Sequence, residues 1–376
     1  MRVGLVYEGD LDADEGVAHY VRTLAAGLRA ANHDVTLLTA GPRPGGCADF
    51  PGGYSLAREV RVPINGNHVS VAWRASSTAI RRAIRDAPLD VLHIHVPHSP
   101  VLTGAMLRRL APSTAVVATC HMTTSRVPTV LATRLWRRAN RRSLARIDTS
   151  IAVSTTAAKY AREVFGVTPR VIPAMIEARQ AQGTPERAAH VLFVGRLVPR
   201  KGAETLIEAF AALPRPHAGC TLVIAGDGPL RPALERRVRR LGIQARVTFA
   251  GHVTEAAKFE LLAAADIACF PSSDGESFGV VLLEAMAAGG CVVLAGDNPG
   301  YSEVLDNHAD LLVESGTLTA RLDTLLADQA LRERLCEWQQ EHVQRFTVPT
   351  VLPQILDVYR QATRHDWRHE LALAQR

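Results

Sequence analysis

Hydrophobic positions along the first half of the chain alternate between two patterns. Short apolar runs predict strands at Val3–Val6, Val35–Leu38, Val69–Ala72, Val91–Ile94, Ala115–Thr119, Ser150–Val153 and Val171–Ile172. Helical periodicity separates most of these runs; from Gly16 onward, for example, Val17, Val21, Leu24 and Leu28 fall on one helical face. Near-continuous apolar strands that alternate with helices predict a parallel sheet covered on both faces.

The same alternation starts again in the second half. It predicts strands at Val191–Val194, Thr221–Ala225, Val247–Phe249, Ile267–Phe270, Val292–Leu294 and Leu311–Val313, and helices at Ala203–Ala212, Leu230–Leu241, Phe259–Ala265 and Gly279–Ala288. The stretch Ile176–Ala188 lacks a hydrophobic period and is rich in Glu, Arg and Gln, as in a surface connection. A last amphipathic helix, Val351–Ala362, follows, and its periodicity does not assign it to either half.

A chain of 376 residues is long enough for two domains. We therefore expect an α/β protein with two doubly wound, Rossmann-like domains, residues 1–170 and 171–350, facing a central cleft. In each domain a ligand is expected outside the carboxyl ends of the strands. The cleft is thus the expected site.

Composition narrows the class of protein. Apolar residues make up 47% of the chain and charged residues 21%, as in a soluble globular protein. The six cysteines form no CxxC pair and favour a reduced, intracellular protein. We see neither a secretory signal nor an apolar run long enough to span a bilayer. These features predict a cytoplasmic protein, attached at most to a membrane face.

The net charge of +6 is unevenly spread. One helix face would carry Arg134, Arg137, Arg138, Arg141 and Arg142, and a smaller stripe consists of Arg81, Arg82 and Arg85. Such runs are most often solvated helix faces. The functional alternative is contact with anionic lipid or with a phosphorylated acceptor. Nucleic acid is disfavoured, because no aromatic residues interleave with the arginines and no nucleic-acid-binding module is recognisable.

The segment from Gly275 to Gly289 carries the strongest candidate chemistry. Its helix is expected to start near Ser277, Phe278 and Gly279. The first free N–H groups, at Gly279, Val280 and Val281, would then face an anion. At ~100° per residue, Glu276 and Glu284 are expected within about 80° of each other on one side of this helix. Each carboxylate alone would be an ordinary surface charge. Together with the glycines they favour a binding site.

A second cluster follows the strand at Val191–Val194. Arg196 and Lys201 lie on the loop at its carboxyl end and could grip a diphosphate as its negative charge grows in a transition state. Alone, this loop could equally be a basic surface loop. No DxD-type or His/Cys ligand set is visible, so we predict no metal. The turn Ala225–Leu230 is a weak signal that any doubly wound domain can show.

In the first half, Gly16 opens a helix and allows a phosphate or sugar to come close to the backbone. His121 comes directly after the apolar run that ends at Cys120, at the expected cleft edge. His93 and His95 alternate along one strand, and we interpret them as structural histidines.

With these motifs, the chain resembles the GT-B glycosyltransferases of family 4 over nearly its whole length. The resemblance rests on Gly-Arg-Leu-Val-Pro-Arg-Lys-Gly, on Ala-Gly-Asp-Gly-Pro and on the pair Glu276 and Glu284. Within the family, the Gly275–Gly289 segment, Asp-Val-Leu-His-Ile-His and the Thr-Thr pair after His121 are most similar to the actinobacterial phosphatidylinositol mannosyltransferases.

The resemblance implies a role for each matching position. Arg196 and Lys201, with the backbone at Gly16, would hold the donor diphosphate. Val253 and Lys258 would lie near the donor base, and Glu284 would bind the ribose. Glu276 and His121 would contact the donor sugar and support the reaction. The resemblance also implies retention of the anomeric configuration, no required metal or cofactor, and a C-terminal helix, residues 351–376, that returns to the first domain.

The chain departs from the family on the acceptor side. Glu15 stands where a glycine is common, His98 replaces an expected small amide, and Ile172–Ile176 differs from the usual Ile-Pro-Asn-Gly-Val. The acceptor-side candidates are Glu15, His98, Thr123 and Arg126. An inositol phospholipid and a soluble small-molecule or natural-product acceptor both stay open, as do GDP-mannose and a UDP-sugar as donor.

The leading hypothesis is therefore a retaining hexosyltransferase that uses a nucleotide diphosphate sugar. A sugar-nucleotide epimerase on the same fold is the alternative from another class, and it would need further acid–base carboxylates. A silent binding protein is disfavoured because both carboxylates and both cations are present. A dinucleotide oxidoreductase is disfavoured because the first turn lacks GxGxxG.

Overall fold

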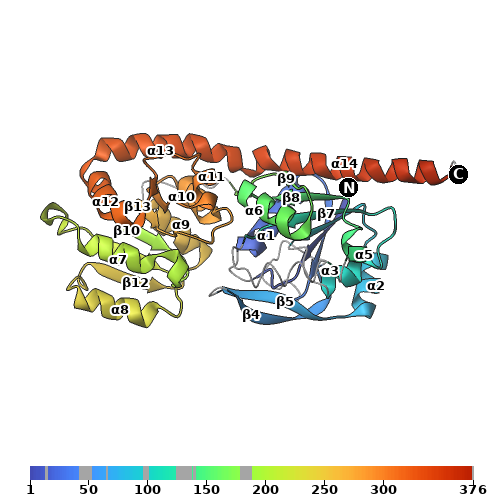
Figure 1. The fold of residues 1–376 in the computed structure, drawn as a ribbon, viewed down its shortest axis with the longest axis horizontal. Coiled ribbons are helices and arrows are strands. Elements are labelled where there is room, and N and C mark those ends of the chain that lie inside the picture. The colour runs from blue at the N-terminus through green and yellow to red at the C-terminus, as the bar shows by residue number, and fades with distance from the viewer. Residues whose placement is uncertain are drawn as a thin grey trace. The chain divides into compact units, whose positions relative to one another are not determined.

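The computed structural model describes residues 1–12, 16–41, 53–64, 67–95, 101–123, 138, 141–177 and 189–374. The chain divides into two compact units (Figure 1). Unit 1 consists of Met1–Met175 and Val348–Arg376, and unit 2 consists of Ile176–Thr347. Each unit is built around its own parallel sheet, as the alternation of apolar strands and helices predicted.

The sheet of unit 1 has the order β3-β2-β1-β6-β7-β8-β9. Its strands are β1 (Arg2–Tyr7), β2 (Asp34–Thr39), β3 (Tyr54–Ser55), β6 (Val91–His95), β7 (Ala115–Cys120), β8 (Thr149–Ala152) and β9 (Arg170–Val171). All neighbouring strands are parallel. The order reverses between β1 and β6, so the carboxyl ends of β1, β6 and β7 meet where such sheets bind their ligands.

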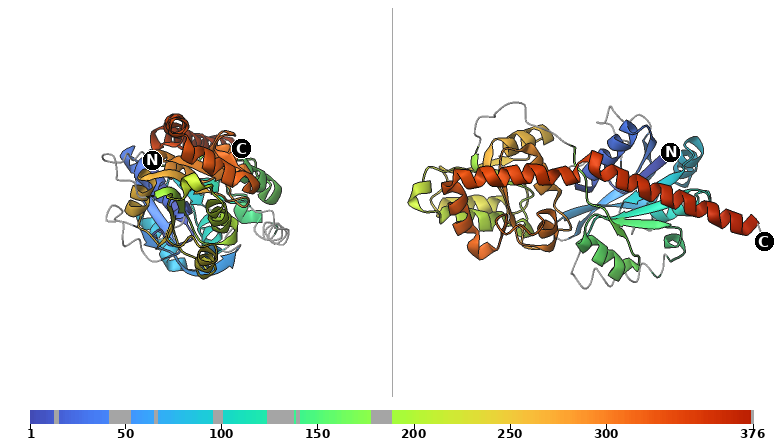
Figure 2. Two further views of the ribbon diagram at one scale, coloured as in Figure 1. Left: turned by 90° about the vertical axis from the view of Figure 1, so that its left-hand side faces the viewer. Right: turned by 90° about the horizontal axis from the view of Figure 1, so that it is seen from above.

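Helices from both ends of the chain cover this sheet. They are α1 (Gly16–Ala30), α2 (Ser77–Asp86), α3 (Leu102–Leu107), α5 (Arg141–Leu144), α6 (Thr155–Tyr160), the π-helical turn η1 (Ala161–Phe165) and α14 (Val348–Ala374). The long helix α14 packs against α1 and β7 (Figure 2). A Cβ on Gly27 would lie 2.9 Å from Cγ1 of Val348, so glycine lets α1 approach α14 closely. No helix among the described residues has the length and apolar composition needed to cross a bilayer.

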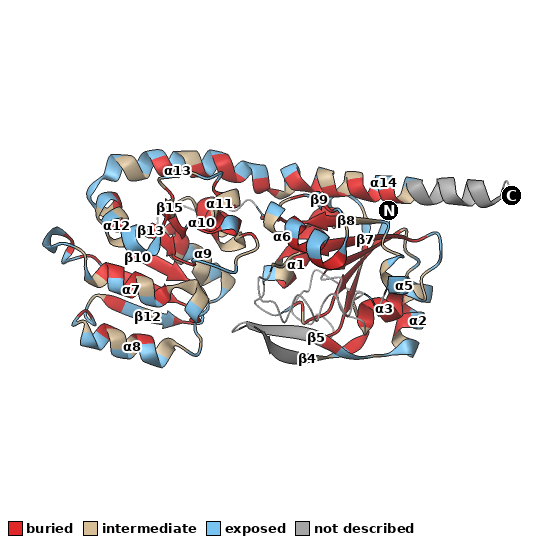
Figure 3. Ribbon diagram, viewed as in Figure 1, coloured by how far each residue is buried: buried red, intermediate tan, exposed pale blue. Residues whose placement is uncertain are grey.

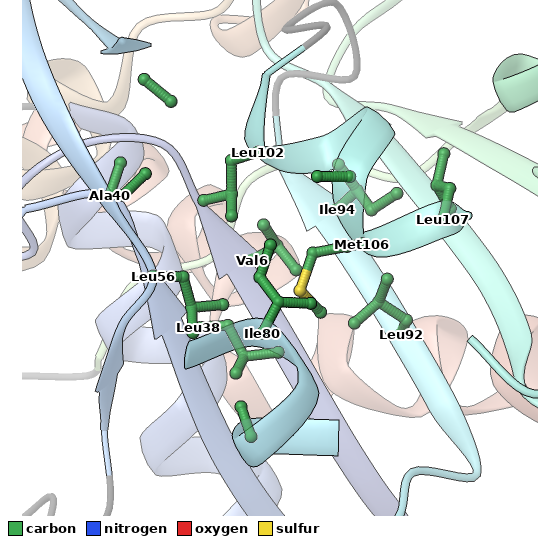
Figure 4. Packing of buried hydrophobic residues seen from close by; sticks show 14 of the residues in the cluster. Val6, Leu38, Ala40, Leu56, Ile80, Leu92, Ile94, Leu102, Met106 and Leu107 are labelled. Carbon is green, nitrogen blue, oxygen red and sulfur yellow. The ribbon is translucent and has the colours of Figure 1, made fainter. Parts of the chain in front are cut away.

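Burial is concentrated on the central strands (Figure 3). In unit 1, one buried cluster joins Val6 on β1 and Ile94 on β6 to Ile80 on α2 and Met106 on α3 (Figure 4). Leu56, between β3 and the following hairpin, joins the same cluster. This packing fixes the helices that follow the hairpin and β6 against the sheet.

Unit 2 has the sheet order β12-β11-β10-β13-β14-β15, with every pair parallel. Its strands are β10 (Ala189–Val194), β11 (Leu222–Ala225), β12 (Val247–Gly251), β13 (Ala265–Phe270), β14 (Val292–Gly296) and β15 (Leu312–Val313). Its helices are α7 (Ala203–Ala211), α8 (Arg231–Arg240), α9 (Glu255–Ala263), α10 (Val280–Ala288), α11 (Pro299–Val304), α12 (Leu318–Ala327) and α13 (Gln329–Val343). The order reverses between β10 and β13, which is the switch point of this sheet.

The strand predicted at Val69–Ala72 exists, but it does not belong to the parallel sheet. It lies in β5 (Asn67–Ala75), which pairs antiparallel with β4 (Ala57–Ile64) in a separate two-stranded hairpin. The register shifts between Arg58 and Glu59, which marks a bulge. The strand itself was predicted correctly, but its place in the parallel sheet was not, because an apolar run does not identify the partner of a strand.

The helix predicted at Phe259–Ala265 is displaced. Helix α9 begins at Glu255, where the side chain of Thr254 accepts a hydrogen bond from the N–H of Ala257, and Ala265 already belongs to β13. Helices α11, α12 and α13 were not predicted. Most of the connection predicted at Ile176–Ala188 lies outside the described residues.

Candidate active site

The first candidate site lies at the carboxyl ends of β10 and β13 in unit 2. The loop after β10 forms a 3-10 turn at Pro199–Lys201 and ends at Gly202, whose φ is 73°. A Cβ on Gly202 would lie 2.5 Å from the carbonyl oxygen of Pro271, the residue that follows β13. Glycine therefore lets the basic turn lie directly against the segment that leads to Glu276.

The carboxylate of Glu276 is held between two cations. Its Oε1 lies 2.5 Å from Nη1 of Arg200 and 2.8 Å from Nζ of Lys201. It also accepts a hydrogen bond from Oγ of Ser272 at 3.1 Å. The side chain of Glu276 is only 11% exposed and that of Lys201 18%. These contacts make a partly desolvated, charge-assisted cluster at the switch point.

The ionisation of this cluster follows from its contacts. Burial opposes ionisation of Glu276, but the charges of Lys201 and Arg200 outweigh it, so the pKa of Glu276 lies below its ordinary value. Burial lowers the pKa of Lys201, and the pairing with Glu276 only partly offsets that effect. The nearby charge of Arg196 lowers the pKa of Lys201 further. Arg196 itself is exposed on the loop after β10.

The N-terminus of α10 lies next to this cluster in the chain. Helix α10 begins at Val280 after the N-cap residue Gly279, whose φ is 129°. Because the N-cap residue is glycine, no N-cap side chain accepts a hydrogen bond from the first N–H groups of this helix. A Cβ on Gly279 would lie 2.7 Å from the ring of Tyr301, so the glycine is closely packed. Uncapped N–H groups and the positive end of the helix dipole suit an anion.

The predicted angular relation between the two carboxylates is wrong. Glu276 precedes α10, and only Glu284 lies within the helix, so one helical rotation does not relate them. The two carboxylates form ion pairs with different cations. Oε2 of Glu284 lies 3.0 Å from Nζ of Lys258, which also pairs with Glu255 at 2.9 Å. Burial lowers the pKa of Lys258, but Glu284 and Glu255 outweigh it, and the net pKa is raised.

Three further residues predicted to bind the donor differ in exposure. Val253, between β12 and α9, and Ser277 are half-buried. Phe278 is 4% exposed, and its ring lies 6.0 Å from that of Phe346. The side chain of Phe278 therefore belongs to the core of unit 2, and only its backbone could serve a ligand.

The second candidate site lies at the carboxyl ends of β6 and β7 in unit 1. Nδ1 of His95, the last residue of β6, lies 3.1 Å from Nε2 of His121, which follows β7. The ring of Tyr20 on α1 packs edge-on against both, at 4.7 Å from His121 and 5.6 Å from His95. Burial lowers the pKa of His121 to about 3, and it lowers that of His95 as well. This site is made of neutral imidazoles.

His93 lies two residues before His95 on β6. Its Nδ1 is 2.7 Å from Oη of Tyr359 on α14, and its Nε2 is 2.6 Å from Oγ1 of Thr119 on β7. Burial lowers the pKa of His93 to about 3. His93 is therefore a satisfied core histidine that ties α14 to the sheet, in agreement with the structural interpretation of this residue.

Gly16 and Thr123 complete the described part of this site. Gly16 is the first residue of α1, is exposed, and would place a Cβ in open space among the described residues. The fold thus does not itself require glycine there. Thr123 is half-buried. Glu15, His98 and Arg126, the other acceptor-side candidates, lie outside the described residues, as do Arg134 and Arg137.

Sequence reasoning missed Arg200, Ser272, His95 and Tyr20 as site residues. Arg200 was detectable, since it directly precedes Lys201 on the same basic turn. His95 was also detectable, because it ends a strand and adjoins the strand that leads to His121. Ser272 and Tyr20 carry no local signal and depend on the packing.

Family models match both parts of the chain. Residues 15–180 match the family described as Glycosyltransferase Family 4, and residues 175–342 match Glycosyl transferases group 1. The phosphatidyl-myo-inositol mannosyltransferase of Mycobacterium leprae is 32% identical over 375 residues, which cover 96% of each chain.

Solved structures with this fold include sucrose-phosphate synthase from Thermosynechococcus elongatus, with a TM-score of 0.73, 22% identity and coverage of 96% of this chain and 98% of that chain. An Anabaena protein solved with UDP-glucose has a TM-score of 0.72, 19% identity and coverage of 96% and 99%. The fold and the family models define a GT-B glycosyltransferase. The chain belongs to the group 1/family 4 glycosyltransferases, a hexosyltransferase similar over almost its full length to the phosphatidyl-myo-inositol mannosyltransferases.

Proposed function

We propose that this chain transfers mannose from GDP-mannose to a hydroxyl of an inositol phospholipid, with retention of the anomeric configuration and without a catalytic metal. The observation that supports it most is the carboxylate of Glu276 between Arg200 and Lys201, beside the uncapped start of α10. The similarity to phosphatidyl-myo-inositol mannosyltransferases over 96% of the chain supports the choice of donor and acceptor.

In this proposal the donor binds mainly to unit 2. Arg196 and Lys201 hold the diphosphate, together with the N–H groups that begin α10 and the backbone at Gly16. Glu284 binds the ribose, while Val253 and Lys258 lie near the base. Lys258 and Glu284 already contact each other, which supports a shared nucleoside subsite.

The chemistry assigned to the site is stabilisation of a leaving group. As the bond between the sugar and the diphosphate breaks, negative charge grows on the diphosphate. Cations and helix N–H groups in a partly desolvated site stabilise that charge. Glu276 and His121 contact the donor sugar, and Thr123 lies on the acceptor side with Glu15, His98 and Arg126.

A screen of nucleotide sugars tests this proposal. GDP-mannose and GDP are expected to raise the melting temperature of the full chain more than UDP-glucose and UDP do, and GDP-mannose is expected to be slowly hydrolysed. Selective stabilisation by UDP would assign a UDP-sugar as the donor instead. Release of an epimeric sugar without acceptor would indicate an epimerase. The anomeric configuration of the transferred sugar, read by NMR, tests retention.

We further propose that unit 1 contacts anionic lipid at the cytoplasmic membrane face. Arg81, Arg82 and Arg85 on α2 are exposed, and Asp86 pairs with the latter two. Helix α2 contacts α3, which contacts α5, where further exposed arginines lie. In the neighbouring hairpin, Trp73 is 72% exposed, an aromatic that suits the headgroup region.

Co-sedimentation with vesicles tests this contact. The chain is expected to bind phosphatidylserine-containing vesicles at low salt and to dissociate at high salt. The triple variant Arg81→Ser, Arg82→Ser, Arg85→Ser should lose most of this binding. Its control removes the same charge from exposed positions of α8, Arg236→Ser, Arg239→Ser, Arg240→Ser. Absence of binding at low salt would refute the membrane contact.

A further inference from the structure

His95 contacts the candidate catalytic histidine from inside the core. It is 0% exposed at the carboxyl end of β6, and its Nδ1 lies 3.1 Å from Nε2 of His121. The other ring nitrogen, Nε2, is buried and has no hydrogen-bond partner among the described residues. Tyr20 packs against the edges of both rings and limits their rotation.

A hydrogen bond between two neutral imidazoles has two possible directions. If His121 donates from Nε2, then His95 carries its proton on Nε2, where a buried N–H faces no acceptor among the described residues. If His95 donates from Nδ1, its Nε2 is left with only a lone pair. A buried N–H without an acceptor is rarer in proteins than an acceptor without a donor. The second direction is therefore favoured.

We propose that His95 is a positioning residue that donates its Nδ1–H to Nε2 of His121 and so fixes the proton of His121 on Nδ1. This makes His121 a hydrogen-bond donor at Nδ1 suited to a hydroxyl oxygen of the donor sugar. The role of the His121 ring toward sugar rests on the proposed function. The tautomer itself is a property of unit 1 alone and can be measured without any substrate.

His93 provides a matched comparison on the same strand. It is equally buried, but its nitrogens contact Thr119 and Tyr359 and not His121. Loss of either histidine removes a buried ring and its hydrogen bonds. Only the loss of His95 removes the bond to His121.

The first measurement is the nitrogen NMR spectrum of the full chain labelled with ¹⁵N-histidine. The resonances of His121 are assigned by their absence in His121→Gln. Nδ1 of His121 is expected to be protonated and Nε2 to be an unprotonated acceptor. A protonated Nε2 on His121 would overturn the proposal. This result does not depend on activity, so it stands apart from any failure of the proposed function.

The second measurement compares transfer rates of His95→Leu, His95→Asn and His93→Leu. His95→Leu is expected to lower kcat about tenfold or more while KM for the donor changes little. The amide of asparagine can replace Nδ1–H, so His95→Asn should retain most of kcat. His93→Leu should lower the melting temperature with kcat nearly unchanged. Equal loss of kcat in both leucine variants would contradict the proposal, and if His95→Leu does not fold, the spectrum of the unaltered chain decides.

Discussion

The two units place their candidate residues at equivalent positions, each on its own sheet, but the charges of those residues differ. Each has a parallel sheet that reverses its order beside the first strand, and each places its candidate residues at the carboxyl ends around that reversal. In unit 1 these residues include imidazoles that burial keeps neutral, such as His93 and His95. In unit 2 they are full charges that neutralise one another, as Glu276 does with Arg200 and Lys201.

This difference separates a site of fixed geometry from a site that can exchange partners. A neutral, hydrogen-bonded ring is inexpensive to bury and holds one orientation. Burial of a carboxylate has to be offset by cations or hydrogen bonds, and Glu276 has the cations of Arg200 and Lys201. In the proposed function, those cations exchange this carboxylate for the donor diphosphate. Unit 2 therefore starts from a state in which its own carboxylate occupies the cations that a diphosphate would need.

The largest expected effect is that of Glu276→Gln. Transfer should fall on the order of 10³-fold, because the variant loses the charge that the proposal assigns to the donor sugar. The affinity for the free nucleoside diphosphate should rise about threefold to tenfold, because the competing carboxylate on Lys201 and Arg200 is gone. Isothermal titration calorimetry with GDP and a transfer assay measure the two effects.

The control for this variant is Glu337→Gln, which removes an exposed carboxylate from α13. It should change neither quantity. Weaker GDP binding by Glu276→Gln would contradict the exchange of partners, and full turnover would remove Glu276 from the proposed mechanism.

The second effect is a loss of stability in mild acid that is larger in unit 1 than in unit 2, where burial lowers the pKa of His342 as well. The unfolded chain binds a proton at His93 below its ordinary pKa of 6.5, whereas the folded chain does so only near 3. Protons between these values favour unfolding, so stability falls as the pH drops. At pH 5 the loss is about 2 kcal/mol for this histidine. The pKa of Glu276 is depressed in the folded chain, so protons begin to destabilise unit 2 through this carboxylate only below its ordinary pKa of 4.5.

Urea titrations from pH 7 and pH 5, each followed by a thiol-labelling pulse at neutral pH, measure this difference. Buried Cys120 on β7 reports on unit 1, and buried Cys269 on β13 reports on unit 2. The midpoint for Cys120 should fall more than that for Cys269. In His93→Asn the loss at Cys120 should be about 2 kcal/mol smaller. Equal shifts at both cysteines would mean that the two units do not differ in this way.

The smallest expected effect concerns the packing behind the proposed anion site. Gly279→Ala should destabilise unit 2 by about 1 kcal/mol, because its φ of 129° disfavours a side chain and the new Cβ would meet the ring of Tyr301. The labelling midpoint of Cys269 measures it. Gly316→Ala, where a Cβ meets open space among the described residues, is the matched control and should be nearly neutral.

Local pattern was enough to predict most strands of both sheets, because a fully buried parallel strand needs a continuous apolar run. It was not enough for β5, whose run looks the same although its partner is an antiparallel hairpin strand. The start of α9 was missed because Thr254, and not the first apolar residue, sets that end through its cap. The basic turn and the two carboxylates were identified as candidate site residues, but the ion pairs that these carboxylates form were not predicted.

The sequence by itself determined the family, the alternation of strands and helices, and the identity of the charged and imidazole groups. These are local properties, since periodicity records burial and motifs record composition. Only the tertiary structure decided that Glu276 meets Arg200, 76 residues away, and that His95 meets His121, 26 residues away. Such contacts depend on which strands are neighbours, because strand order decides which loops share one edge of the sheet.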